Sequence, residues 1–329
     1  GSGGEANVGQ WVLGAGNSNG GSSITVSSGL GNSVVFDLGS YVKASDIING
    51  SRIEIEFTMR VGDQPFADNR KFNVLAESSQ TTTLEGKASF SSSGIAVIAS
   101  IAEPVLSISH GVVSSSNGTV SGTSGSWNAP SSGGQPFSGS ITDITAVNGD
   151  VVGIDGGDIL RLATAIENSG GGSAFDVSTS VTLPSGLAFV GGGLSNANLQ
   201  IYRGDGTELQ LGSHYTVSGT TITFIDSVGV GTLLPGRSGT GNDTSGANLV
   251  VITYDVEVSA SIAASRTLES SANLLNYAST EGGDNFVSGS PLVDTAGQQV
   301  GAPEIDKGFA GGSLDNGDSS ASHTTGANL

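Results

Sequence analysis

Three acidic turns are the residues in this sequence best suited to bind a metal ion. They are Asp155-Gly156-Gly157-Asp158, Asp205-Gly206-Thr207-Glu208 and Asp315-Asn316-Gly317-Asp318. Turns of this kind bring carboxylate and main-chain carbonyl oxygens together, and these are the ligands that Ca²⁺ prefers. None has EF-hand spacing or the nonapeptide period of a calcium-binding β-roll. Two interpretations stay open: solvated turns, or a Ca²⁺ site, for which the candidate ligands are Asp315 and Asp318 first, then Asp155, Asp158, Asp205 and Glu208.

Residues that could catalyse a reaction are few. Gly16-Asn17-Ser18-Asn19-Gly20 fits the G-x-S-x-G pattern, but a hydrolase elbow needs a strand before it and a helix after it. Further turn residues follow here, and a chain with 53 glycines produces the pattern by chance. His110, His214 and His323 stand in unrelated contexts, where each is better explained as a strand or turn residue than as a base. The sequence therefore predicts no catalytic residue and a protein that is not an enzyme.

Composition favours an all-β protein. The 53 glycines and the low aromatic content, 5%, are typical of short strands joined by many turns. The net charge of −19 repels nucleic-acid phosphates and anionic membrane surfaces. The chain has no cysteine, which excludes disulfides and thiolate metal sites. The longest apolar run, Ile95 to Ala102, is too short to cross a bilayer, so we expect no membrane insertion in this segment.

The elements that must position these turns are clearest between Gly157 and Val190, where two strands are expected. In the first, Leu160, Leu162, Thr164 and Ile166 alternate with Arg161, Ala163, Ala165 and Glu167, which is the period of a half-buried strand. Residues 168–172, Asn-Ser-Gly-Gly-Gly, then turn the chain. A second strand follows, with one face made of Phe175, Val177, Thr179, Val181 and Leu183. It ends at Pro184-Ser185-Gly186, because proline cannot donate to a strand ladder.

The same stretch resembles the DUF11-type repeat of prokaryotic surface proteins, an immunoglobulin-like β-sandwich. The resemblance rests on Gly157-Asp158, Glu167-Asn168-Ser169-Gly170, Ala174-Phe175-Asp176-Val177 and Thr182-Leu183-Pro184-Ser185-Gly186-Leu187. The family usually has an acidic residue just before its Thr-Leu-Pro, where this chain has Val181, so no role of that carboxylate carries over. The resemblance implies an extracellular structural module at a bacterial or archaeal cell surface, and it does not say what the module contacts.

An internal repeat supports a tandem architecture without reference to any family. Segments recur in the same order at a shift of about 190 to 200 residues. The matches are Ala6–Trp11 with Ala197–Tyr202, Ile24–Ser27 with Tyr215–Ser218, Val34–Asp37 with Thr221–Phe224, Ile53–Val61 with Val250–Val258, Phe72–Ala76 with Ala272–Asn276, and Glu103-Pro104 with Ala302-Pro303. We predict that residues 1–102 are the C-terminal part of a first repeat, 103–301 a complete repeat, and 302–329 the opening strand of a third. Such a pattern is expected of a segment of a larger protein.

The alternation within the strands predicts how each sheet is buried. Ile53–Val61 and Val250–Val258 each place five apolar residues on one face, and in the second strand these are Val250, Ile252, Tyr254, Val256 and Val258. This pattern is typical of an antiparallel sheet with one face packed and the other solvated.

The Ser/Gly-rich segment 114–148 carries two isolated aromatic residues, Trp127 and Phe137. One interpretation is a long surface loop whose aromatic side chains cover an edge of the core. The other is an exposed patch that contacts a neighbouring chain. Trp11, Trp127 and Tyr202 are the only aromatic residues from which a binding site at one end of the sandwich could be built.

Together these features predict tandem immunoglobulin-like antiparallel β-sandwiches in a large extracellular surface protein: a stalk, a fibre or a surface-layer or filament building block. The expected partners are neighbouring repeats or copies of the same protein. The alternative is an adhesin module whose loops bind a surface glycan or a partner protein.

Overall fold

The computed structural model describes residues 25–28, 34–37, 65–77, 79–80, 90–91, 94–122, 127–130, 135–225, 245–287 and 289–303. The chain divides into two compact units, Gly1–Val61 and Gly62–Leu329. The predicted strand Ile53–Val61, the G-x-S-x-G match and Trp11 lie outside the described residues. The predicted boundary at residues 102 and 103 falls within the second unit, and the repeat boundaries stay a prediction.

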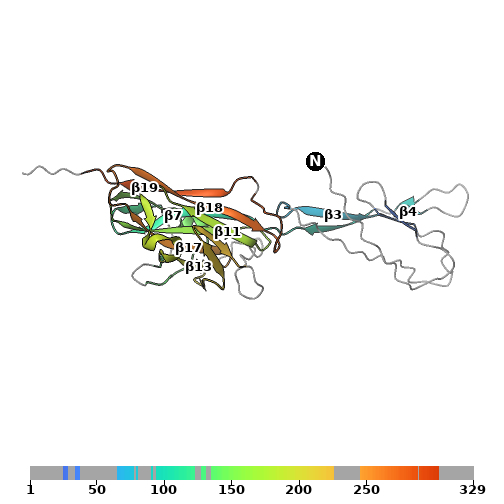
Figure 1. Ribbon diagram of the computed structural model, residues 1–329. Coiled ribbons are helices and arrows are strands. Elements are labelled where there is room, and N and C mark those ends of the chain that lie inside the picture. Colours follow the sequence, from blue (N-terminus) through green and yellow to red (C-terminus); the bar gives the residue numbers. More distant parts are fainter. Residues whose placement is uncertain are drawn as a thin grey trace, which may run out of the picture. The chain divides into compact units, whose positions relative to one another are not determined.

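The strands between residues 106 and 300 form two sheets packed face to face (Figure 1). The first sheet has the order β14 (Glu208–Leu209), β13 (Gln200–Arg203), β17 (Leu249–Val258), β10 (Ile159–Asn168) and β7 (Leu106–Ser115), and β12 (Leu187–Phe189) also pairs with β17. The second has the order β15 (Tyr215–Ser218), β16 (Thr221–Phe224), β11 (Phe175–Thr182), β18 (Thr267–Ala278), β19 (Leu292–Val300), β9 (Asp150–Ile154) and β8 (Thr119–Ser121). All pairs are antiparallel except β19 with β9.

The core between the sheets follows from the alternation in the sequence. Leu160, Leu162 and Ile166 of β10 are buried there, as predicted. The five predicted inward residues of β17 are also in this core. Residues 168–172 turn the chain between β10 and β11, and β11 ends at Thr182, just before Pro184. The period-2 pattern therefore predicted the inner faces of these strands correctly.

The prediction of a solvated outer face is wrong for the first sheet. Ala163, Ala165, Leu249 and Val251 are buried in a second cluster, which we call the outer core. Residues 127–130 and 135–147 cover it and contribute Ile141, Ala146 and Val147, with a short 3₁₀ helix, η1 (Ile144–Ala146). The apolar residues at both faces of β10 and β17 are shielded because this Ser/Gly-rich segment packs on the outer side of the sheet.

Two buried charged residues on the same outer face pair with each other. Arg161 of β10 and Asp255 of β17 are both buried, and Arg161 Nη1 lies 2.6 Å from Asp255 Oδ1. Arg161 Nη2 also donates to Thr253 Oγ1 at 3.0 Å. A buried charge without such partners would cost several kcal/mol, so the pair makes it feasible to cover this face.

Shorter hairpins lie N-terminal to the sandwich. Strand β1 (Thr25–Ser28) pairs with β2 (Val34–Asp37), in the place predicted for the counterpart of β15–β16. Strand β3 (Lys71–Ala76) pairs antiparallel with β6 (Ile95–Ser100), as β18 pairs with β19. Strands β4 (Ser79–Gln80) and β5 (Phe90–Ser91) form a further short pair.

The prediction of an all-β, immunoglobulin-like sandwich is confirmed. The helices in the described part of the chain are 3₁₀ turns: η1, η2 (Val190–Gly192) and η3 (Leu194–Asn196). Within these ranges, no helix is long and apolar enough to cross a membrane.

Candidate functional site: the two ends of the sandwich

The polypeptide enters the sandwich beside one end of strand β10 and leaves it beside the other end. Leu106, the first residue of β7, pairs with Asn168 at the C-terminal end of β10. Gly301, just after the last strand, donates its N–H to Ile154 O at 2.9 Å, and residues 155–158 connect Ile154 to Ile159 at the N-terminal end of β10. A ten-residue strand spans about 33 Å. The polypeptide therefore passes through the sandwich along its strand axis.

Asn168 holds the chain where it begins the sandwich. Its fully buried side chain accepts the N–H of Val105 at 3.1 Å and the N–H of Gly170 at 3.1 Å through Oδ1. Its Nδ2 donates to Gly172 O at 2.7 Å. One amide side chain thus satisfies the main chain of both the turn and the incoming segment, as a side chain with both a donor and an acceptor can.

The glycines of the turn let these two segments approach closely. A Cβ on Gly170 would overlap Glu103 O and lie 2.5 Å from Val105 N. A Cβ on Gly172 would lie 2.6 Å from Ala102 O. The close approach allows Gly172 N to donate to Glu103 O at 3.1 Å, and Ser169 N to Val105 O at 2.9 Å. We call residues 103–105 and 168–172 the N-terminal anchor.

The other end, which we call the C-terminal anchor, consists of residues 297–301 and their neighbours on β9 and β18. Val300 N donates to Arg266 O at 2.9 Å, and β19 runs parallel to β9 with Gln298 opposite Val151. Gly297 N donates to Asp150 Oδ1 at 2.6 Å. Strand β19 is therefore held on both sides, mainly by its main chain.

The first and last strands also touch each other through His110. Its N–H donates to Asp294 Oδ2 of β19 at 2.6 Å, and its ring is fully buried between the sheets. Burial disfavours the imidazolium ion and lowers the pKa of His110 to about 4. His110 is a strand residue and His214 lies in the turn before β15, as predicted, while His323 lies outside the described residues.

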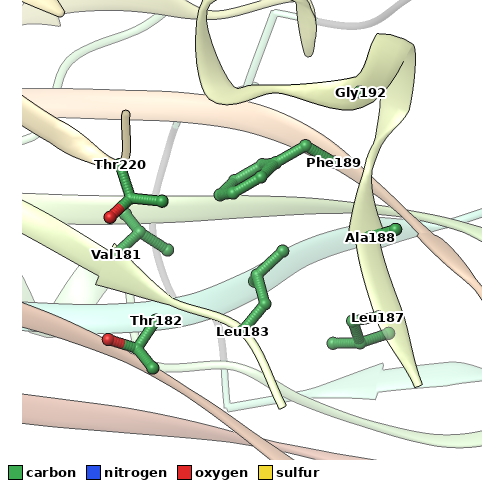
Figure 2. Close-up of a pocket in the computed structure, with 8 residues that line it drawn as sticks. All are labelled: Val181, Thr182, Leu183, Leu187, Ala188, Phe189, Gly192 and Thr220. Carbon is green, nitrogen blue, oxygen red and sulfur yellow. The ribbon is translucent and has the colours of Figure 1, made fainter. Parts of the chain in front are cut away.

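An open groove lies between β11 and β12 on the side of the C-terminal anchor (Figure 2). Its volume is about 520 Å³, and Phe189, Leu183 and Val181 extend toward it. The complete lining is Val181, Thr182, Leu183, Leu187, Ala188, Phe189, Gly192 and Thr220. This lining has no acid, base or metal ligand among its side chains, so it offers an apolar contact surface and no general acid–base chemistry.

The acidic turns are used as turns where the structure describes them. Asp158 Oδ2 accepts the N–H of Asp155 at 2.6 Å, and Asp205 Oδ1 accepts the N–H of Thr207 at 2.9 Å. Glu208 is exposed on β14. In the described ranges, no three His, Cys, Asp or Glu side chains come close enough to hold a metal ion. Asp315 and Asp318 lie outside those ranges, and Ca²⁺ binding stays a prediction.

The structure brings two of the three aromatic candidates together. Phe137 stacks on Trp127 with ring centroids 5.8 Å apart and on Tyr202 at 5.1 Å. Tyr202 is buried, Trp127 and Phe137 are half-buried, and both of the latter pack against the outer core. Of the two interpretations of this segment, aromatic cover of a core fits better than an exposed contact patch. The aromatic side chains cover the outer face of the first sheet, however, and not an edge of the core.

Sequence reasoning did not identify the polar groups of the inner core as a cluster. His110, Ser270 and Gln298 lie at inward positions of three strands whose other inward residues are mainly apolar. The available signal was this departure from the apolar pattern. It becomes meaningful only when strands that are distant in the sequence are placed side by side.

No family model matches the sequence, so the DUF11-type resemblance stays a prediction. No curated protein matches it either. Among solved structures, the pilus backbone RrgB of Streptococcus pneumoniae is 19% identical, with 38% of this chain and 43% of that chain covered and a TM-score of 0.29. The T6 backbone pilin of serotype M6 Streptococcus pyogenes is 12% identical, with 69% and 42% covered and a TM-score of 0.32.

A collagen-binding domain from a Staphylococcus aureus adhesin is 14% identical, with 42% of this chain and 87% of that chain covered and a TM-score of 0.25. The chain thus spans less than half the length of the two pilin structures. Because the TM-scores are below 0.5, no functional argument rests on these likenesses.

Proposed function

We propose that this chain is a load-bearing segment of an extracellular surface structure, in which β-sandwich repeats follow one another end to end. The observation that carries the proposal is the position of the two anchors at opposite ends of β10. A stalk or fibre needs each module to receive the chain at one end and release it at the other. The net charge of −19 and the absence of cysteine agree with a soluble, disulfide-free surface module.

The directions of the first and last strands also suit tension. Strands β7 and β19 both run from the end of the N-terminal anchor toward the end of the C-terminal anchor. Pulling the termini apart draws β7 one way and β19 the other, along their own axes. The hydrogen bonds of β7 with β10, and of β19 with β18 and β9, are then loaded together rather than one after another.

The resemblance to DUF11-type repeats and the internal repeat support the same function. The hairpins β1–β2 and β3–β6 stand where a preceding repeat would have its counterparts of β15–β16 and β18–β19. The partners in this proposal are neighbouring repeats or further copies of the chain. The adhesin alternative receives no support from the Trp127–Phe137–Tyr202 stack, since it covers the outer core.

Single-molecule pulling in two directions tests the proposal. Because the chain has no cysteine, handles can be attached at introduced pairs: Val105→Cys with Ala302→Cys loads the anchors, and Asn117→Cys with Ala302→Cys pulls on two sites at the same end. All three positions are exposed. We expect the first pair to unfold at clearly higher force, with a length gain of about 65 nm from roughly 200 residues.

The control is the thermal melt of both double variants, which should agree with that of the parent chain. Equal unfolding forces in the two directions, with intact melts, would show that the sandwich is not built for axial load.

A further inference from the structure

Three fully buried polar side chains meet between the sheets. His110 comes from β7 of the first sheet, and Ser270 and Gln298 come from β18 and β19 of the second. Ser270 Oγ lies 3.0 Å from His110 Nε2 and 2.8 Å from Gln298 Nε2. The Ser270 hydroxyl is therefore in hydrogen-bond reach of both the imidazole and the carboxamide. Thr164 Oγ1 lies 3.0 Å from the other ring nitrogen of His110, and the group as a whole sits in the core between the sheets.

The hydrogen-bond directions in this group follow from its partners. Two groups lie at His110 Nδ1: Ala163 O at 3.1 Å, which can only accept, and the Thr164 hydroxyl at 3.0 Å, which can donate or accept. We assign the proton to Nδ1, because this tautomer satisfies Ala163 O. Nε2 of the neutral ring is then an acceptor, and the Ser270 hydroxyl donates to it. Gln298 Nε2 donates to Ser270 Oγ and, at 2.8 Å, to Ala296 O. Ser270 is therefore a hydroxyl oriented toward a base, the arrangement that activates a nucleophile.

A purely structural polar network does not account for all of these atoms. The Oε1 atom of Gln298 is buried and has no hydrogen-bond partner in the described part of the chain. Buried networks that serve stability alone have their members satisfied.

We propose that Ser270 and Gln298 form an ester cross-link by an acyl transfer within the chain. Ser270 Oγ attacks Cδ of Gln298 while His110 Nε2 takes the hydroxyl proton. The tetrahedral intermediate collapses, the C–N bond breaks, and the proton moves from His110 to the leaving nitrogen, which departs as ammonia. One O–H and one C–N bond are exchanged for one C–O bond and one N–H bond, and no oxidant or cofactor is needed.

The surroundings hold the reacting groups in place and protect the product. The reacting groups are held on three strands of a packed core, so little ordering remains for the transition state. Water is excluded from the core, which slows hydrolysis of the ester. Ammonia that reaches solvent is protonated and diluted, and this draws the reaction forward. The cross-link would join the last strand covalently to β18, and it does not depend on the proposed load-bearing function.

Intact mass spectrometry of the purified, denatured full chain tests the proposal. We expect a mass below that of the sequence by one ammonia, about 17 Da. A protease that cuts after Glu269, Glu281 and Glu304 should leave residues 270–281 and 282–304 joined as one species. Mild alkali should separate the two peptides and leave glutamate at position 298.

Two variants show whether the missing ammonia depends on Ser270. Ser270→Ala should restore the full mass, whereas Ser271→Ala, on the opposite face of the same strand, should keep the deficit. A full mass in a parent chain that melts cooperatively would overturn the proposal. So would a deficit that persists in Ser270→Ala, since it would arise from loss of ammonia elsewhere. The measurement on the parent chain stands even where a variant folds poorly.

Discussion

The N-terminal anchor holds the chain with a side chain and with glycines, whereas the C-terminal anchor holds it mainly with main-chain hydrogen bonds. At the first, Asn168 bonds three main-chain groups, and the turn approaches residues 103–105 with no room for a Cβ at position 170. At the second, Val300 and Gly301 donate to carbonyls of Arg266 and Ile154. The first arrangement depends on residue identity at a few positions, and the second on the register of three strands.

The two ends should therefore differ in their tolerance of substitution. A main-chain ladder survives most changes of side chain, because each residue supplies the same donor and acceptor. A side-chain bridge does not, since replacing one partner leaves several buried groups unsatisfied at once.

Gly170→Ala should cause the largest loss. The new Cβ would overlap Glu103 O, so the turn or the incoming segment must shift, and we expect a loss of about 3 kcal/mol in the free energy of unfolding. Gly193→Ala is the matched control, because a Cβ there meets nothing within 4 Å and the backbone is extended. Denaturant unfolding of both variants measures the difference. Equal stabilities would mean that the N-terminal anchor is not closely packed.

Acid should destabilise the N-terminal and C-terminal anchors together, because His110 joins β7 to β19. Its pKa is about 4 in the folded chain and 6.5 when unfolded, so the folded state favours the neutral ring. The resulting stability is complete above pH 6.5 and is lost as the pH falls toward 4. Between pH 7.5 and 5 we expect a loss of about 2 kcal/mol. The nearby Asp294 carboxylate favours the charged ring and limits this loss.

Unfolding curves at several pH values measure this loss, and hydrogen exchange at Val105 and Gly301 shows whether both anchors loosen. His110→Gln should flatten the dependence over this range, while His214→Gln, which alters a half-buried turn residue, should leave it in place. A pH dependence unchanged by His110→Gln would assign it to other groups.

The inner faces of the strands and the turn at 168–172 could be predicted from the sequence, because both are local signals. Alternation fixes which residues of β10 and β17 face the core, and Asn and Gly mark the turn. The packing of a segment on the outer face of the first sheet could not be predicted. Residues 127–147 have no period, and the pairing of Arg161 with Asp255 joins positions 94 residues apart.

The two anchors also differ in how far they could be predicted from the sequence. Asn168 and its glycines belong to a motif that can be recognised in the chain, although its role in holding Val105 appears only in three dimensions. The C-terminal anchor is hardly indicated by residue type, because it is formed mainly by main-chain hydrogen bonds. The contacts of His110 with Ser270 and Asp294 cross between sheets, and no local pattern encodes them.

A substitution at the C-terminal anchor should have a smaller effect. Asp150→Ala removes the carboxylate that accepts the N–H of Gly297, but Asp150 is exposed and solvent can replace it. We expect a loss of about 1 kcal/mol in the free energy of unfolding. Asp284→Ala, at an exposed position outside the strands, serves as the control for loss of one negative charge. A loss as large as that of Gly170→Ala would contradict the difference between the two ends.

Calcium should have the smallest effect, and only at the C-terminal anchor. The turn of Asp155 and Asp158 directly follows Ile154, whose carbonyl accepts the N–H of Gly301. If this turn binds Ca²⁺ in the folded state alone, a concentration equal to Kd raises the free energy of unfolding by about 0.4 kcal/mol. Thermal melts in millimolar CaCl₂ and in chelator measure the change, with MgCl₂ as the control for ionic strength.

Asp158→Asn should abolish a rise that comes from this turn. A rise that survives the substitution points to another set of ligands, for which Asp315 and Asp318 are the next pair to replace. Identical melts in calcium and chelator would leave the turns at 155–158 and 205–208 as solvated connections, each held by a hydrogen bond from a main-chain N–H to an aspartate carboxylate of the same turn.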